Sequence, residues 1–183
     1  MTSPASGPAG WRAKVADLRQ RRWFRWALDL GLAVAVVAGI GAWQTRDHMA
    51  PGTVVSGVTL RSLDGGSSLL SSFRGKPTAV AFWAPWCSVC KAESGNLSWL
   101  AKLVGDRAHV VSVAAAYDSL QDVRTYITDQ QVDYQVLLGN DEIVRAFRIE
   151  AFPTVYFLDA EGRVKGSVSG YTTTPGLLAR LLL

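Results

Sequence analysis

The chain is poor in the residue types that bind soft metals or build disulfide frameworks. Its 183 residues include only two cysteines, two histidines and two methionines. A structural zinc site needs four ligands, and the cysteines could be joined only by His48 and His109, which stand apart from them in the sequence. Two cysteines cannot supply a disulfide framework either. A hydrophobic core must therefore hold the fold, and an apolar content of 49% is sufficient for one.

Basic residues are in excess only near the N-terminus. The net charge is +4, yet residues 1–25 carry six basic side chains against Asp17 alone. The remaining residues carry 13 basic and 14 acidic side chains, so the body of the protein is not basic. This distribution disfavours nucleic-acid binding. It indicates instead a basic N-terminal segment that sets the orientation of the chain across a membrane.

Residues 26–43, WALDLGLAVAVVAGIGAW, form an apolar stretch interrupted only by Asp29. As a helix they would be about 27 Å long, close to the ~30 Å hydrocarbon core of a bilayer. We therefore predict a transmembrane signal anchor at 26–43, a basic cytoplasmic segment at 1–25, a tether at 44–57 and an exported domain at 58–183. A cleaved secretory signal is the alternative, with Gly39–Gly41 as the best cleavage candidate, and it also leads to export.

Both cysteines fall in the stretch Thr78–Glu93, TAVAFWAPWCSVCKAE. An apolar run of strand length ends at Pro85, and the residues after it are expected to open a helix. A thiol at a helix N-terminus faces unpaired N–H groups and the positive end of the helix dipole, which favour the thiolate. Cys87 occupies that position. Cys90 lies one turn further on the same face, so the pair can shuttle two electrons.

The Cys-x-x-Cys pair has two other interpretations. Half of a zinc site is disfavoured because the other ligands are missing. An inert structural disulfide is disfavoured because so short a loop removes little entropy from the unfolded chain.

The chain resembles the thioredoxin-fold oxidoreductases, and most closely the membrane-tethered TlpA/ResA/ScsD-like branch. The resemblance covers roughly residues 54–183. It depends on FWAPWCSVC at 82–90, on Glu93, on Phe152-Pro153-Thr154, and on an entry hairpin within 60–76.

This resemblance implies roles for further residues. Pro153 would be cis and lie beside the cysteines, so that Phe152, Pro153 and Thr154 bind an extended substrate strand. Independently of the resemblance, Trp86 flanks the Cys-x-x-Cys motif and would offer an apolar platform to the substrate, unless it only packs against the rest of the fold. Glu93 would accept the proton of the Cys90 thiol, unless it is simply a solvated helix residue.

The remaining pattern predicts an α/β thioredoxin-like fold, with a mixed central sheet flanked by helices. Strands are expected near 58–70, 78–83, 110–116, 134–138, 154–158 and 163–168, and helices near 90–104, 119–127, 141–147 and 175–183. A bend is expected at Gly95. The helix and strand at 119–138 exceed the minimal thioredoxin plan, an insertion that the TlpA-like branch has.

The sequence thus predicts a tethered thiol–disulfide oxidoreductase that reduces disulfides in exported proteins through a Cys87–Cys90 cycle. It would act as a monomer in the inner membrane, with its catalytic domain in the periplasm and no metal or other cofactor. No third cysteine is present, so a membrane thiol–disulfide donor must return the electrons. Two alternatives stay open: a disulfide-forming oxidase, and a module that binds Cu(I) through both thiolates.

Overall fold

The computed structural model describes residues 23–24, 26–36, 39–40, 48–55 and 57–183. The chain divides into two units, 1–44 and 45–183. In the first unit, residues 23–24, 26–36 and 39–40 are helical, with apolar side chains exposed. Across the described residues, no helix combines the length and apolar character needed to cross a membrane. The predicted span at 26–43 includes residues 37–38 and 41–43, which lie outside that description, as does nearly all of the predicted basic segment.

The second unit is built on a seven-stranded sheet of order β2-β1-β5-β4-β3-β6-β7. β3, β4 and β5 are parallel to one another, and the remaining neighbours pair antiparallel. The strands are β1 (Thr59–Ser62), β2 (Ser67–Leu69), β3 (Thr78–Trp83), β4 (His109–Ala114), β5 (Gln135–Leu138), β6 (Thr154–Leu158) and β7 (Val164–Ser169). The helices are η1 (Leu70–Phe73), α2 (Ser88–Val104), η2 (Gly105–Arg107), α3 (Leu120–Asp129), α4 (Asp141–Ala146) and α5 (Thr174–Leu182).

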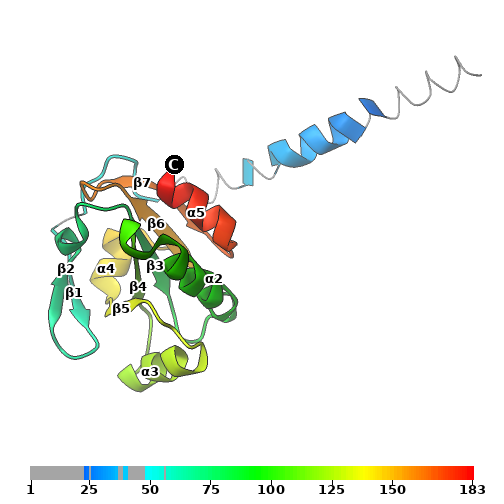
Figure 1. Ribbon diagram of the computed structural model, residues 1–183. Helices are drawn as coiled ribbons and strands as arrows, with labels where there is room; N and C mark the ends of the chain where they lie inside the picture. The colour runs from blue at the N-terminus through cyan, green and yellow to red at the C-terminus, as the bar shows by residue number, and fades with distance from the viewer. Residues whose placement is uncertain (1–22, 25, 37–38, 41–47, 56) are drawn as a thin grey trace, which may run out of the picture. The chain divides into compact units, whose positions relative to one another are not determined.

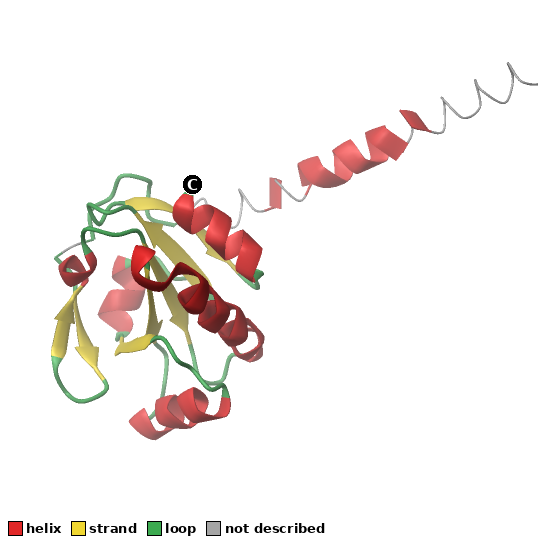
Figure 2. Ribbon diagram, in the orientation of Figure 1, coloured by secondary structure: helices red, strands yellow, loops and turns green. Residues whose placement is uncertain are grey.

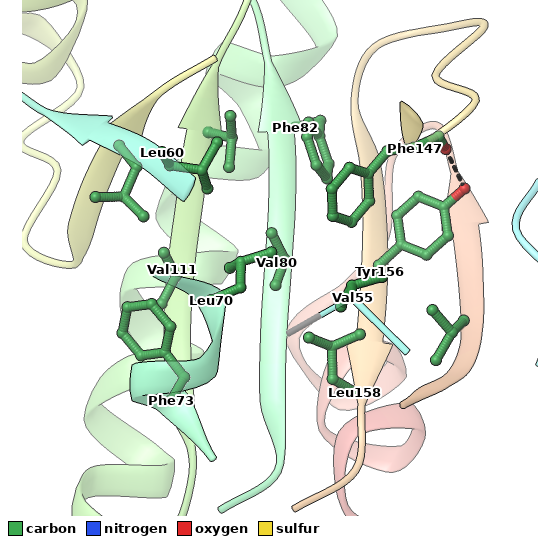
Figure 3. Close-up of a cluster of buried hydrophobic side chains, with 13 residues drawn as sticks. Val55, Leu60, Leu70, Phe73, Val80, Phe82, Val111, Phe147, Tyr156 and Leu158 are labelled. Carbon is green, nitrogen blue, oxygen red and sulfur yellow. Dashed lines mark hydrogen bonds between the residues drawn. The ribbon is translucent and has the colours of Figure 1, made fainter. Parts of the chain in front are cut away.

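Side-chain alternation along the central strands buries apolar side chains on both faces of the sheet, and the described residues form three such clusters. Helices lie in front of the sheet and behind it (Figures 1 and 2). Val80 and Phe82 of β3 face a cluster that includes Phe147 and Tyr156 (Figure 3). The Tyr156 hydroxyl donates to the Phe147 carbonyl at 2.6 Å, which satisfies a polar group inside this apolar cluster. On the other face, the small side chains of β3 leave room for α2 and α5, whose leucines pack against the sheet.

Residues 48–55, within the stretch assigned to the tether, pack against this unit. The Gly52 N–H donates to the Val164 carbonyl at 2.8 Å, and the Val164 N–H donates to Thr53 at 2.9 Å. Val55 is buried in the core, and the buried ring of His48 lies 2.7 Å from the Ser167 hydroxyl. The folded unit therefore takes in part of the expected tether, because these residues cover the exposed edge at β7.

The predicted elements agree with the observed ones to within a few residues at each end. The entry hairpin, the α3–β5 insertion and the final β6–β7–α5 arrangement all form, so the thioredoxin-like mixed sheet is confirmed. Helix α2 continues without interruption through Gly95, where a bend was expected. The strand expected at 110–116 ends at Ala114, because the chain turns at Ala116, whose φ is +48°.

Candidate functional site

The two cysteines lie where β3 leads into α2. β3 is buried along its whole length, and Cys87 is the N-cap of α2. Its backbone is extended, while residues from Ser88 onward are helical. The Cys87 sulfur accepts a hydrogen bond from the Cys90 N–H at 3.1 Å. The first-turn amide thus points at the sulfur, which is the arrangement that favours a thiolate.

Cys87 and Cys90 form a disulfide with their Cα atoms 5.3 Å apart. Cys87 is 6% exposed and Cys90 is 2% exposed. Both are shielded, but an external group reaches Cys87 more readily. This asymmetry fits an attacking Cys87 and a resolving Cys90.

Glu93, one turn beyond Cys90, is buried at 1% exposure. The Thr172 N–H donates to its Oε1 at 2.8 Å, while its Oε2 has no hydrogen-bond partner among the described residues. Burial raises the pKa of Glu93 to about 7, and the hydrogen bond from Thr172 only partly opposes this. The interpretation of Glu93 as a solvated helix residue is therefore wrong. A carboxyl with this pKa can take up or release a proton near neutral pH.

Trp86 is a fixed, exposed aromatic platform next to Cys87. Its side chain is 66% exposed, yet its indole N–H donates to the Ala116 carbonyl at 2.8 Å. The ring also meets Phe152 edge to face, with ring centroids 5.9 Å apart. Trp86 therefore connects the loop after β4 with the loop before β6.

The Phe152–Pro153 peptide bond is cis, as expected. Pro153 is buried and its carbonyl accepts from the Gly170 N–H at 2.8 Å. Among the described residues, neither backbone group of Phe152 has a hydrogen-bond partner. An extended polypeptide could pair there, close to Trp86.

Thr154 does not present its side chain to solvent. It is fully buried, and its hydroxyl donates to the Ala151 carbonyl at 2.8 Å and lies 2.7 Å from the Ser169 hydroxyl. The hydroxyl therefore holds the loop that carries Phe152 and Pro153.

Three residues that support the site had not been identified from the sequence. Thr172 holds Glu93, the Ala116 carbonyl holds Trp86, and Tyr126 stacks on Trp83 with ring centroids 3.9 Å apart. Burial raises the pKa of Tyr126, so its hydroxyl stays neutral at ordinary pH. Thr172 and Ala116 act through a backbone N–H and a backbone carbonyl. Because any residue type could supply these groups, the sequence gives no signal for either role.

The chain matches a protein-family model and is similar in sequence to known thioredoxin-like proteins. A model of the AhpC/TSA family matches residues 51–167, which contain Cys87, Cys90, Glu93 and Pro153. Thioredoxin-like protein YneN of Bacillus subtilis (strain 168) is 29% identical over 109 residues, which cover 58% of this chain and 64% of YneN. The chain therefore spans just under two thirds of that relative.

Two further similarities extend over most of the other protein. Thiol-disulfide oxidoreductase ResA of Geobacillus kaustophilus is 23% identical over 158 residues, covering 85% of this chain and 91% of ResA. The solved structure of the exposed lipoprotein thioredoxin Etrx1 of Streptococcus pneumoniae is 26% identical, with a TM-score of 0.61, covering 68% of this chain and 96% of Etrx1. The fold is thus shared with a solved thioredoxin structure, and the sequence is similar to that of a protein named as a thiol-disulfide oxidoreductase.

Proposed function

This chain belongs to the AhpC/TSA family, and from that premise we propose that it is a membrane-tethered, extracytoplasmic reductase of disulfides in exported proteins. The class of reaction is thiol–disulfide exchange, the activity for which relatives such as ResA are named. One observation carries the proposal: the redox pair Cys87–Cys90 at the start of α2, with the Cys90 N–H directed at the Cys87 sulfur.

In the reduced protein, the Cys87 thiolate attacks one sulfur of the substrate disulfide. A mixed disulfide forms and the other substrate sulfur leaves as a thiolate, which takes up a proton. Cys90 then loses its proton and attacks the Cys87 sulfur, which releases the second substrate thiolate. Two electrons have passed to the substrate, and Cys87–Cys90 is left oxidised until a membrane thiol–disulfide donor reduces it again.

Glu93 is the group we assign to the proton of Cys90. Its burial, its unpartnered Oε2 and its pKa of about 7 support this role. A carboxylate with that pKa is basic enough to accept a thiol proton and acidic enough to return it. Ala81 of β3 is buried, but its apolar side chain cannot accept a proton in place of Glu93.

Trp86, Phe152 and Pro153 would bind the substrate, with Thr154 in support. The exposed indole of Trp86 is in contact with the ring of Phe152, whose backbone groups are unpaired among the described residues. A polypeptide that paired with Phe152 would bring its own disulfide against Cys87, the more accessible sulfur of the pair.

Tethering is supported by the first unit of the chain. In the described helix at 26–36, Asp29 is the only charged residue among otherwise apolar ones, a composition that supports a membrane-embedded helix. The basic residues before it favour a cytoplasmic N-terminus. The similarity to Etrx1, described as an exposed lipoprotein, supports an extracytoplasmic place for residues 58–183. We also propose a monomer that needs no cofactor.

Insulin reduction tests the activity. The purified chain, reduced beforehand and freed of reductant, should reduce insulin disulfides in an amount equal to its own dithiol. Cys87→Ser should abolish this transfer, whereas Ser88→Ala, beside it, should not. If the wild type transfers no electrons to insulin, but its oxidised form rapidly oxidises a reduced unfolded protein, the proposed direction is wrong.

A further inference from the structure

A cavity of about 330 Å³ lies between the active-site turn and α3. Pro85 and Trp86, the two residues before Cys87, line one side of it, and one face of α3 lines the other. Figure 1 shows α3 at the end of the unit where α2 begins. The residues that line the cavity do not include Phe152 or Pro153.

The walls of the cavity are held in place without a ligand. Trp86 is fixed by its hydrogen bond to Ala116 and its contact with Phe152. Tyr126 is fixed by stacking on Trp83. The start of α3 is secured by a capping box, in which Ser119 and Asp122 bond to each other's backbone N–H groups. The cavity is therefore preformed, and little free energy is needed to order its walls when a ligand binds.

The charge of the lining favours a cation. Asp118, Asp122 and Asp129 face the cavity together with a single cation, Lys91. Asp122 is engaged in the capping box, but within the described residues Asp118 and Asp129 make no ion pair or side-chain hydrogen bond. Carboxylates beside the aromatic rings of Trp86 and Tyr126 match a side chain with an aliphatic stem and a cationic tip.

We propose that this cavity binds a lysine or arginine side chain of the polypeptide whose disulfide is exchanged at Cys87. The inference depends on the proposed function and adds substrate selection to it. Trp86 is the common wall between the cavity and the Phe152–Pro153 loop. A substrate chain that crosses Trp86 therefore offers its sulfur to Cys87 and its neighbouring side chain to Asp118 and Asp129. Disulfides with nearby basic residues are thereby favoured over those with nearby acidic residues.

Paired peptides test the proposal. Two short peptides, each closed by an internal disulfide, are made identical except for lysine or glutamine beside the cysteines. The reduced full chain in neutral detergent should reduce the lysine peptide roughly fivefold faster, as expected for partly exposed ion-pair and cation–π contacts. In the double variant Asp118→Asn/Asp129→Asn this ratio should fall to within about twofold of unity. The ratio is measured within one protein, so any loss of folded protein cancels.

Asp106→Asn is the matched control. It removes one carboxylate, as each substitution of the double variant does, from the exposed residue Asp106 in η2, beyond the other end of α2, and should keep the full lysine preference. Equal rates for the two peptides in the wild type, or an undiminished ratio in the double variant, would overturn the proposal. An equal loss in Asp106→Asn would also overturn it, because a general charge effect would then explain the preference.

An uncharged small disulfide, 4,4′-dithiodipyridine, tests whether Cys87 exchanges disulfides at all. It therefore distinguishes an error in the cavity proposal from an error in the proposed function. If Cys87 reacts with it and both peptides are reduced at equal rates, only the cavity proposal is wrong. If neither this reagent nor either peptide is reduced, the proposed reductase activity is wrong.

Discussion

Replacing Glu93 by glutamine should make the folded unit more stable above neutral pH. The folded pKa of about 7 lies above the ordinary value of 4.5, because burial penalises the charged carboxylate. Between these two values the folded state binds more protons than the unfolded state, so the free energy of unfolding falls as pH rises. For a single group the fall between pH 5 and pH 8 is roughly 2.5 kcal/mol.

Glutamine keeps an oxygen for the Thr172 N–H but cannot ionise. The variant should therefore resemble the wild type at pH 5 and exceed its stability by roughly 2.5 kcal/mol at pH 8. Urea unfolding of the oxidised unit 45–183, followed by tryptophan fluorescence at several pH values, measures the difference. The contributions of other titrating groups, such as His109, are the same in both proteins and cancel in the difference between their free energies of unfolding.

Glu161→Gln provides the control, because Glu161 is exposed in the β6–β7 turn. Its stability should follow that of the wild type at every pH. If the Glu93→Gln curve also runs parallel to the wild type from pH 5 to pH 8, Glu93 does not titrate near neutrality. The assignment of Glu93 as the proton acceptor for Cys90 would then lose its physical basis.

Three further outcomes are expected. Cys90→Ser should accumulate a mixed disulfide with a peptide substrate, visible by mass spectrometry without reductant, whereas Cys87→Ser should not. Trp86→Ala should lower the second-order rate constant for peptide disulfides about tenfold, because an aromatic contact beside the reacting sulfur is lost; unchanged rates would remove Trp86 from the substrate site. Tyr156→Phe should reduce the free energy of unfolding by about 1–2 kcal/mol in urea titration, because the buried Phe147 carbonyl loses its donor; an unchanged midpoint would mean that water replaces the hydroxyl.

Local patterns were enough to predict the redox pair and its surroundings. The apolar run of β3, the break at Pro85 and the spacing of Cys87 and Cys90 fix the strand, turn and helix start with no help from distant residues. The alternation of strands and helices predicted a mixed sheet with an added helix and strand. The resemblance implied the cis peptide bond before Pro153.

Contacts between distant segments were beyond the sequence pattern. Glu93 is buried because the chain near Thr172, 79 residues away, covers it and donates to it. Trp86 owes its fixed position to a backbone carbonyl 30 residues away, which any residue type could supply. Residues 48–55 read as a polar tether, yet they pair with the edge at Val164 because that edge offers unpaired backbone groups.

The equilibrium reduction potential of Cys87–Cys90 tests the central claim most directly. The unit 45–183 is equilibrated in dithiothreitol and glutathione buffers, and the thiol and disulfide forms are counted after alkylation. A reductase fed by a membrane donor should have a potential toward that of thioredoxin, about −270 mV. A potential toward about −120 mV would contradict the proposal, because the pair would then be a strong oxidant that forms disulfides in exported proteins.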